Sequence, residues 1–377
     1  MPDAPVASIP TDPPEGQPEA GTALCLSGGG YRAMLFHVGA LWRLYQAGLL
    51  QGLSRISSVS GGSIAAGVLA LRWGELSFNP AKIRTDFVPL VVTPVRALAG
   101  ETIDARAILL GVVLPGRVSD RVAAAYDKHL FHGATLQDLP DTPRFVINAT
   151  NVQSGALWRF MKPYMRDYRV GEVRAPTVPL AQAVAASSAF PPVLSPLALR
   201  LDADAFTPNS GLDLQRPPFT TRVFLTDGGV YDNLGLETAW KRHQTVLVSD
   251  GGGRLPPEER PRSDWARHSY RVLELIDNQV RSLRKRQVID SYKTGTRRGA
   301  YWGIRTDIAD YRLADPLACP HDRTLALAET PTRLKGLAPD VQERLINWGF
   351  AVCDTALRKH VEPGLKRPDG FPYPVGV

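Results

Sequence analysis

The sequence contains little cysteine. Among its 377 residues there are three cysteines, Cys25, Cys319 and Cys353, which stand far apart and form no CxxC pair. Three widely spaced thiols provide neither a disulfide framework nor the ligand spacing of a zinc site. We therefore expect a reducing, cytoplasmic setting.

The first residues are also unlike a signal peptide in pattern, and no run is long enough to predict a membrane span. Residues 1–20 are rich in proline and acidic side chains and contain no Lys or Arg, so we expect a disordered tail. The apolar run FVPLVVTPV at 87–95 is shorter than the roughly 18 residues of a membrane helix, and Pro89 and Pro94 interrupt it. Any contact with a membrane is therefore expected to be peripheral.

The tail is acidic, and the rest of the chain is basic. The formal net charge is +7, and without the four acidic residues of the tail, Asp3, Asp12, Glu15 and Glu19, it rises to +11. A mostly helical stretch at 267–305 holds many of the cations, namely Arg267, Arg271, Arg281, Arg284, Lys285, Arg286, Lys293, Arg297, Arg298 and Arg305.

This basic stretch has two interpretations. It forms a solvated helix face, or it docks on an anionic lipid surface, where each Lys or Arg contributes roughly 1 kcal/mol. Nucleic acid is a poorer explanation, because no recognition motif accompanies the charge.

Short apolar runs alternate with amphipathic helical patterns along the chain. Helices are predicted at 31–47 and 61–73. Strands are predicted at 23–27, 55–59, 144–150, 222–227 and 245–250. This alternation is typical of an α/β fold with a mostly parallel sheet covered by helices. No period of 20 to 50 residues indicates a repeat protein.

Three successive glycines in CLSGGGYRAM, residues 25–34, lie between the first predicted strand and helix. A Walker phosphate loop needs a Lys after its last glycine, and none follows Gly30. Gly28, Gly30 and Ala33 match a dinucleotide fingerprint, but the second strand region QGLSRISSVSGGS has no carboxylate to bind a ribose. The remaining interpretation is a loop whose N–H groups hold a reaction oxyanion.

The second predicted strand ends in SVSGGS, residues 58–63, which matches the nucleophile elbow G-x-S-x-G except that Ser58 replaces the first glycine. Ser60 is the candidate nucleophile, followed by Gly61 and by Gly62, which closes the motif. Taken alone, Ser60 is also a plausible helix N-cap. The glycine loop favours the nucleophile, because an acyl-transfer site needs both features.

Together these motifs resemble the patatin-like phospholipases. That family combines a glycine-rich oxyanion loop ending in Arg, a serine elbow and a D-G-G/A motif. The matching residues here are Gly28, Gly29, Gly30, Arg32, Ser60, Asp227, Gly228 and Gly229. GGGYRAM is also similar to the loop of the cytosolic phospholipase A enzymes, and AVAASSAFPPVLSP at 183–196 resembles the stretch before the family's DGG strand. The resemblance covers about residues 22–255.

The resemblance implies a three-layer α/β/α sandwich and a lipid acyl hydrolase for phospholipids or lysophospholipids. It implies a Ser60-Asp227 dyad, in which Asp227 acts as the base without a histidine, an acyl-enzyme intermediate, and no cofactor or metal. Arg32 would face the substrate phosphate or support the loop, although a helix-surface role is also open. Asp250 in VLVSDGGG is a second candidate base, but the sequence after Asp227, VYDNLG, fits the family better.

Several further expectations follow. Residues 21–377 would form one hydrolase domain, with core motifs at 22–255 and a basic helical extension at 256–377. The apolar segment 78–120 forms either a lid or acyl-chain channel, or part of the core. Asp232 and Asn233 are expected to hold the loop after Asp227.

Two other functions stay open. An α/β-hydrolase triad would need one of His243, His268, His321 or His360. A binding protein that keeps the fold without the chemistry is the other alternative, although both dyad residues are present.

Overall fold

A computed structural model describes residues 18–103, 117–261 and 263–377. Within these residues one ten-stranded sheet forms the centre, in the order β10-β9-β1-β2-β3-β4-β5-β6, with β8 on β3 and β7 on β8. The strands are β1 (Glu19–Leu26), β2 (Leu53–Ser58), β3 (Arg144–Asn151), β4 (Ala156–Phe160), β5 (Tyr164–Asp167), β6 (Gly171–Arg174), β7 (Leu197–Arg200), β8 (Arg222–Asp227), β9 (His243–Asp250) and β10 (Arg298–Gly303).

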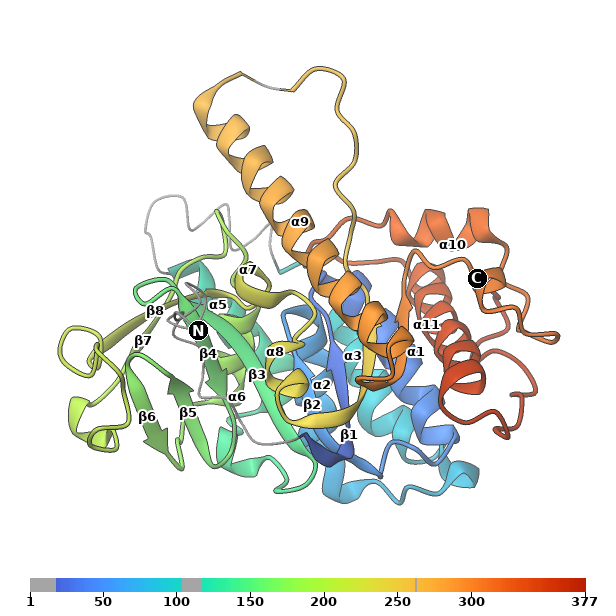
Figure 1. Cartoon of the computed structure of the whole chain (residues 1–377), viewed down its shortest axis with the longest axis horizontal. Coiled ribbons are helices and arrows are strands. Elements are labelled where there is room, and N and C mark those ends of the chain that lie inside the picture. Colours follow the sequence, from blue (N-terminus) through green and yellow to red (C-terminus); the bar gives the residue numbers. More distant parts are fainter. Residues whose placement is uncertain (1–17, 104–116, 262) are drawn as a thin grey trace, which may run out of the picture.

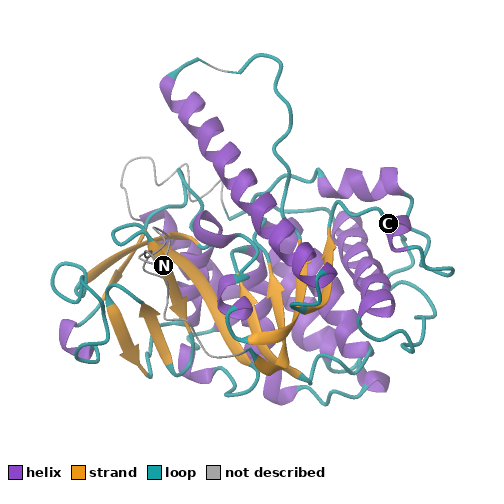
Figure 2. Cartoon of the chain, viewed as in Figure 1, coloured by secondary structure: helices purple, strands orange, loops and turns teal. Residues whose placement is uncertain are grey.

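The helices surround this sheet (Figure 2). They are α1 (Gly30–Gln46), α2 (Gly61–Arg72), α3 (Thr93–Ala99), α5 (Arg117–Tyr126), α6 (Leu180–Ser187), α7 (Gly229–Asp232), α8 (Glu237–Trp240), α9 (Trp265–Lys293), α10 (His321–Ala328) and α11 (Pro339–His360). The five strands from β10 to β3 are parallel. The predicted α/β class with a mostly parallel central sheet is therefore confirmed, and antiparallel strands extend it at the β3 side.

Side chains of β1 alternate between the two faces of the sheet, as strand geometry requires. Leu24 and Leu26 join the large core formed with α1, α2, α6 and α11. Ala23 and Cys25 join a smaller core with residues of α8 and with Val288 of α9. Helices thus cover both faces, which is the three-layer arrangement.

Strand β8 runs antiparallel to β3, whereas the alternating pattern predicts that 222–227 belongs to a mostly parallel sheet. Asp227 is paired with Ala149 of β3, while Ser58 of the parallel strand β2 is paired with Ile147. Strand β8 therefore approaches from the far end of β3 and stops near the level at which β2 ends. Ser60, after β2, and Asp227, at the end of β8, therefore lie close together although the two strands run in opposite directions.

Two sequence expectations change in the structure. The predicted tail of residues 1–20 includes two residues too many, because Glu19 and Ala20 belong to β1. The N–H of Glu19 donates a hydrogen bond to Arg242 O. Residues 1–17 lie outside the described residues. In the segment 78–120, buried side chains at 87–99 belong to the core, and residues 104–116 lie outside the described residues.

The C-terminal third is built into the fold. Strand β10 adds to the sheet, and α11 packs along α1. Helix α9, 29 residues long, crosses the molecule and its N-terminal half extends well beyond the body (Figure 1). Among the described residues, no helix has both the length and the apolar character needed to cross a bilayer.

Candidate active site

Ser60 lies at the turn between β2 and α2, where the chain reverses from strand to helix. Its backbone has φ 53° and ψ −120°, a left-handed conformation that is uncommon for a residue with a side chain. The side chain is 8% exposed. A strained, nearly buried serine at a strand-to-helix turn is the geometry of a nucleophile elbow.

Close packing explains the glycine after Ser60. A Cβ on Gly61 would lie 2.2 Å from the carbonyl oxygen of Gly30. The elbow and the glycine loop are therefore in direct backbone contact, which no residue other than glycine at position 61 would allow. Ser58 fits without distortion, because its hydroxyl donates to Val146 O at 3.2 Å and accepts from Ser63 Oγ at 3.0 Å.

Asp227 is the hydrogen-bonding partner of the Ser60 side chain. Its Oδ1 accepts from the N–H of Gly229 at 2.7 Å, and its backbone carbonyl accepts from the Thr150 hydroxyl at 2.9 Å. The backbone N–H of Asp227 donates to Ala189 O. Both ends of the residue are held, so the carboxyl group has a defined position beside the serine.

Burial raises the pKa of Asp227 to about 7. The hydrogen bonds from Gly229 and Ser60 work against this rise, and the negative charge of Asp277 on α9 adds to it. A carboxyl with a pKa near neutrality is a far stronger base than an ordinary aspartate, and it still ionises at physiological pH.

The glycine loop turns with left-handed φ angles of 144° at Gly29 and 61° at Gly30, which starts α1. The N–H of Gly28 donates to Asn233 O at 3.0 Å. In the described part of the chain, the N–H groups of Gly29 and Gly30 have no acceptor. Of the three predicted oxyanion donors, two are therefore free, while Gly28 holds the loop.

Arg32 lies inside the fold, 3% exposed, and does not form part of a helix surface. Its Nε donates to Gly251 O, and its Nη1 donates to Ala328 O and to Thr330 O at 2.6 Å. Burial lowers the pKa of Arg32 to about 10, helped by the nearby charges of Arg281 and Arg305.

One guanidinium nitrogen of Arg32, Nη2, is buried and has no partner within the described residues. The contacts of Nε and Nη1 tie the start of α1 to the end of β9 and to the segment after α10. This pattern agrees with the loop-support role more directly than with the phosphate role.

The second Asp-Gly-Gly, at the end of β9, is arranged differently. Asp250 accepts from the Tyr301 hydroxyl at 2.7 Å and from the N–H of Gly252 at 2.9 Å. Burial alone would raise its pKa, but the charge of Arg281 and these hydrogen bonds outweigh burial, and the pKa is lowered. Asp250 is therefore a stabilised carboxylate with a weak basicity.

The candidate triad histidines lie away from the dyad in the chain's structure. His243 is the first residue of β9, at the opposite end of that strand from Asp250. His268 is in the first turns of α9, and His321 and His360 are at the ends of α10 and α11. No hydrogen bond joins any of them to Ser60 or Asp227 among the described residues.

A further buried histidine, His37, contacts Ser249 Oγ at 2.8 Å and Ser27 O at 2.9 Å. Burial lowers its pKa to about 4, so it is neutral and supports the strand ends. The described residues hold no group of three His, Cys, Asp or Glu side chains placed to bind a metal ion.

One contributor to the site carries no sequence signal of its own. Ser187, the last residue of α6, accepts from the backbone N–H of Ser60 at 2.9 Å and contacts Ser63 Oγ at 2.9 Å. Its carbonyl accepts from the N–H of Gly228. Ser187 therefore links the elbow to the Asp227 loop. The resemblance at 183–196 covered this residue without assigning it a role.

Asp232 and Asn233 hold the loop after Asp227, as expected. Asp232 accepts from the N–H groups of Leu234 and Glu237 at 3.2 and 2.7 Å. The backbone carbonyl of Asn233 accepts from the N–H of Gly28, and its Oδ1 would lie only 2.3 Å from a Cβ on Gly28 and 2.7 Å from one on Gly229.

The fold and the site define a three-layer α/β/α protein with a glycine loop, a serine elbow and a buried aspartate at one sheet edge. The family model of patatin-like phospholipases matches residues 24–240, which is more than half of the chain. The chain belongs to the patatin-like phospholipase family, and the predicted resemblance is confirmed.

Solved structures agree with this fold. Human GIVD cytosolic phospholipase A2 in complex with methyl gamma-linolenyl fluorophosphonate aligns with TM-score 0.52 and 15% identity, over 89% of this chain and 57% of that chain. Another structure of the human enzyme aligns with TM-score 0.40 and 14% identity, over 62% and 46%.

VipD from Legionella pneumophila aligns with TM-score 0.37 and 14% identity, over 91% of this chain and 67% of that chain. The chain spans about half the length of the human enzyme. At these identities the likeness concerns the fold alone, and only the alignment at 0.52 is close enough to support it. A comparison with curated proteins finds no match.

Proposed function

We propose that this protein hydrolyses fatty-acyl esters of phospholipids or lysophospholipids through a Ser60-Asp227 dyad. The observation that carries the proposal is the pairing of a strained elbow serine with a buried aspartate whose pKa is raised to about 7. Family membership supports a lipid substrate, and the fluorophosphonate bound to the human enzyme is of the reagent class that serine nucleophiles attack.

In the first step Asp227 takes the proton from Ser60 Oγ as that oxygen attacks the ester carbonyl. The carbonyl oxygen becomes an oxyanion, which the free N–H groups of Gly29 and Gly30 hold, aided by Gly61, the residue after the nucleophile. Helices α1 and α2 begin at Gly30 and Gly61, and the positive ends of their dipoles favour the negative charge of the oxyanion. Protonated Asp227 then gives its proton to the leaving alcohol oxygen, and an acyl-enzyme remains.

In the second step Asp227 takes a proton from water, and the resulting hydroxide attacks the acyl-enzyme. The same N–H groups hold the second oxyanion. When the carbon–oxygen bond to Ser60 breaks, the serine oxygen recovers the proton from Asp227 and the fatty acid leaves. Arg32 keeps the loop in position throughout, through its bonds to the carbonyl oxygens of Gly251, Ala328 and Thr330.

A labelling experiment tests the nucleophile. A fluorophosphonate should add one mass increment to the wild type and none to Ser60→Ala, measured by intact mass. Ser63→Ala is the matched control, because Ser63 is a buried neighbour of the same helix, and it should still be labelled. Labelling of Ser60→Ala equal to that of the wild type, or labelling mapped to Ser58 or Ser63, contradicts the proposal.

Ester hydrolysis, measured beside probe labelling, distinguishes the dyad from the two alternative functions. His243→Ala and His321→Ala should keep near-normal hydrolysis of a soluble short-chain ester, whereas an inactive histidine variant would favour the triad. A folded wild-type protein that neither reacts with the probe nor hydrolyses any ester would favour the binding protein without catalysis.

Docking on an anionic bilayer also belongs to the proposal. Some cations of the 267–305 stretch already interact with other residues of the protein, so they are less open to lipid. Arg284 pairs with Glu237 at 3.0 Å, Arg297 lies over the Trp240 ring, and the charge of Arg281 faces Asp250. The exposed cations of the stretch are Arg267, Lys285, Arg286, Lys293 and Arg298, and we expect them to contribute most of the attraction to anionic lipid.

A further inference from the structure

Helix α9 carries an apolar stripe that nothing in the described chain covers. Trp265, Val272, Ile276 and Leu283 are 83%, 41%, 53% and 57% exposed. Their spacings of 7, 11 and 18 residues from Trp265 place all four on one face of the helix. Leu275, 49% exposed, lies beside them. Five large apolar side chains on one exposed helix form a continuous patch rather than scattered surface residues.

The opposite face of α9 holds the helix to the body. Val288 is buried in the smaller core, Arg284 pairs with Glu237, and the Tyr292 hydroxyl donates to Val246 O at 2.6 Å. Because these contacts lie on the other side of the helix from the stripe, the stripe faces away from the body. The N-terminal half of α9, which contains Trp265 and Val272, projects beyond the rest of the molecule (Figure 1).

The stripe lies close to the candidate active site. Helix α9 packs against α7, which starts two residues after Asp227, and Asp277 of α9 is near enough to raise the pKa of Asp227. Val230 on α7 and Val193 in the loop after α6 are also exposed, by 40% and 42%. Asp277 is 12 residues after Trp265 and so lies on the body-facing side of α9, which means that the dyad and the stripe are close to the same helix but on different sides of it.

The charge of α9 distinguishes between two partners that could cover the stripe, a second copy of the helix and a lipid surface. Residues 265–293 contain seven Lys or Arg and three Asp or Glu, a net charge of +4. Two copies of this helix packed stripe to stripe would repel one another, whereas an anionic lipid surface would attract either copy.

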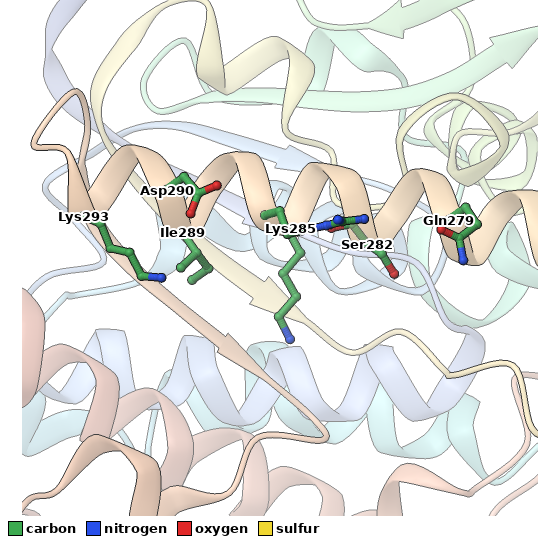
Figure 3. Close-up of a pocket in the computed structure, with 7 residues that line it drawn as sticks. Gln279, Ser282, Lys285, Ile289, Asp290 and Lys293 are labelled. Carbon is green, nitrogen blue, oxygen red and sulfur yellow. The ribbon is translucent and has the colours of Figure 1, made fainter.

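A basic groove of about 470 Å³ adjoins the stripe and is lined in part by Lys285, Arg286 and Lys293. Figure 3 shows Lys285, Ile289 and Lys293 pointing to one side of α9. Apolar residues with cations beside them are typical of helices that lie in a membrane interface.

We propose that the α9 stripe inserts into the surface of a lipid bilayer and holds the Ser60-Asp227 site close to that surface. This inference rests on the proposed function for its biological purpose, but the insertion itself needs no catalysis. It adds an apolar contribution to the electrostatic attraction, so binding should persist in salt that screens exposed charges.

The first test measures vesicle binding in the inactive Ser60→Ala background. Phosphatidylcholine vesicles with and without phosphatidylglycerol are sedimented with the protein at low and high salt. Changing Trp265, Val272 and Ile276 together to Ser should lower the partition coefficient at least ~10-fold on both vesicle types. Leu212→Ser is the matched control, since Leu212 is 66% exposed outside α9, and it should bind like the parent.

The second test locates Trp265 in the lipid. Trp265 is 83% exposed, and five of the other tryptophans, Trp42, Trp73, Trp158, Trp302 and Trp348, are buried. Lipids brominated in the acyl chain should quench part of the tryptophan fluorescence, and Trp265→Phe, which keeps an apolar ring, should bind the vesicles but lose that quenching.

Several outcomes would overturn the inference. Equal vesicle binding by the stripe variant and its parent would do so, as would unchanged quenching in Trp265→Phe. A concentration-dependent dimer without lipid that the stripe variant abolishes would assign the stripe to a second copy instead. Hydrolysis of a soluble short-chain ester, measured with Ser60 intact, reports the proposed function separately and should be unchanged by the stripe substitutions.

Discussion

Strands β8 and β9 end in the same tripeptide, Asp-Gly-Gly, and in both cases the aspartate is buried and accepts a hydrogen bond from the glycine two residues later. The surroundings then differ. Asp227 faces a serine hydroxyl and the negative charge of Asp277, and its pKa rises to about 7. Asp250 faces Arg281 and the Tyr301 hydroxyl, and its pKa falls.

The comparison shows that a motif provides a carboxyl group and a turn, while its neighbours decide what that carboxyl does. A base needs a pKa near the working pH, which isolation from cations provides. A structural carboxylate needs the reverse, a cation and donors that keep it ionised.

The largest expected effect is on catalysis. Asp227→Asn removes the proposed base and should lower kcat on a soluble ester by about 10³-fold or more. Asp250→Asn should lower kcat less than ~10-fold per folded molecule, because the dyad is intact. Steady-state kinetics with circular dichroism as a folding check measures both. Equal losses in the two variants would mean that the two aspartates do not divide the roles as described.

The next largest effect is on the free energy of unfolding, to which Asp227 and Asp250 contribute with opposite pH dependence. The pKa of Asp227 is higher in the folded state, so its contribution is fully present below pH about 4 and is lost as pH rises through about 7. The shift from 3.8 to about 7 corresponds to about 4 kcal/mol. The pKa of Asp250 is lower in the folded state, so its contribution is present above pH about 4 and is lost as pH falls further.

Urea unfolding across pH measures this difference. The loss of stability between pH 4 and 7 should be smaller in Asp227→Asn than in the wild type. In Asp250→Asn that slope should remain, while stability at pH 7 falls by about 1–3 kcal/mol. In activity assays, kcat/KM should increase with pH around 7, as the base form of Asp227 becomes populated. A wild-type slope that persists in Asp227→Asn would contradict the assignment.

A smaller effect on kcat is expected from Ser187, which contacts the elbow but is not part of the dyad. Ser187→Ala leaves the backbone N–H of Ser60 without its acceptor and should lower kcat about 10-fold, with a loss of stability of about 1–3 kcal/mol. Ser188→Ala is the matched control, because its hydroxyl bonds Val184 O and Tyr126 instead. If the two variants behave alike in kcat, Ser187 does not position the elbow.

The smallest effect concerns the elbow's one departure from its motif. Ser58→Gly restores the motif glycine but removes hydrogen bonds to Val146 O and Ser63. We expect kcat to stay within about 3-fold of the wild type and stability to fall by about 1 kcal/mol. A large gain in kcat would show that Ser58 strains the elbow.

Local patterns were sufficient for much of the site. The glycine run, the serine elbow and the DGG motif each depend on residues close in sequence, and they predicted the family correctly. The alternation of apolar runs and helical patterns predicted the α/β class. The strand at 222–227 was predicted as a strand, but its antiparallel direction was not, because direction depends on which neighbour it pairs with. The tail boundary at residue 20 was also wrong, since Glu19 pairs with a residue more than 200 positions away.

By itself, the sequence determined the order of the motifs, the residue types at the turns and the overall positive charge. Only the tertiary structure decided which aspartate lies beside Ser60 and which faces Arg281, and that Arg32 points inward to three carbonyls. It also decided that one face of α9 remains uncovered. The physical reason is that pKa and exposure depend on the charges and atoms around a group, and these come from segments hundreds of residues apart.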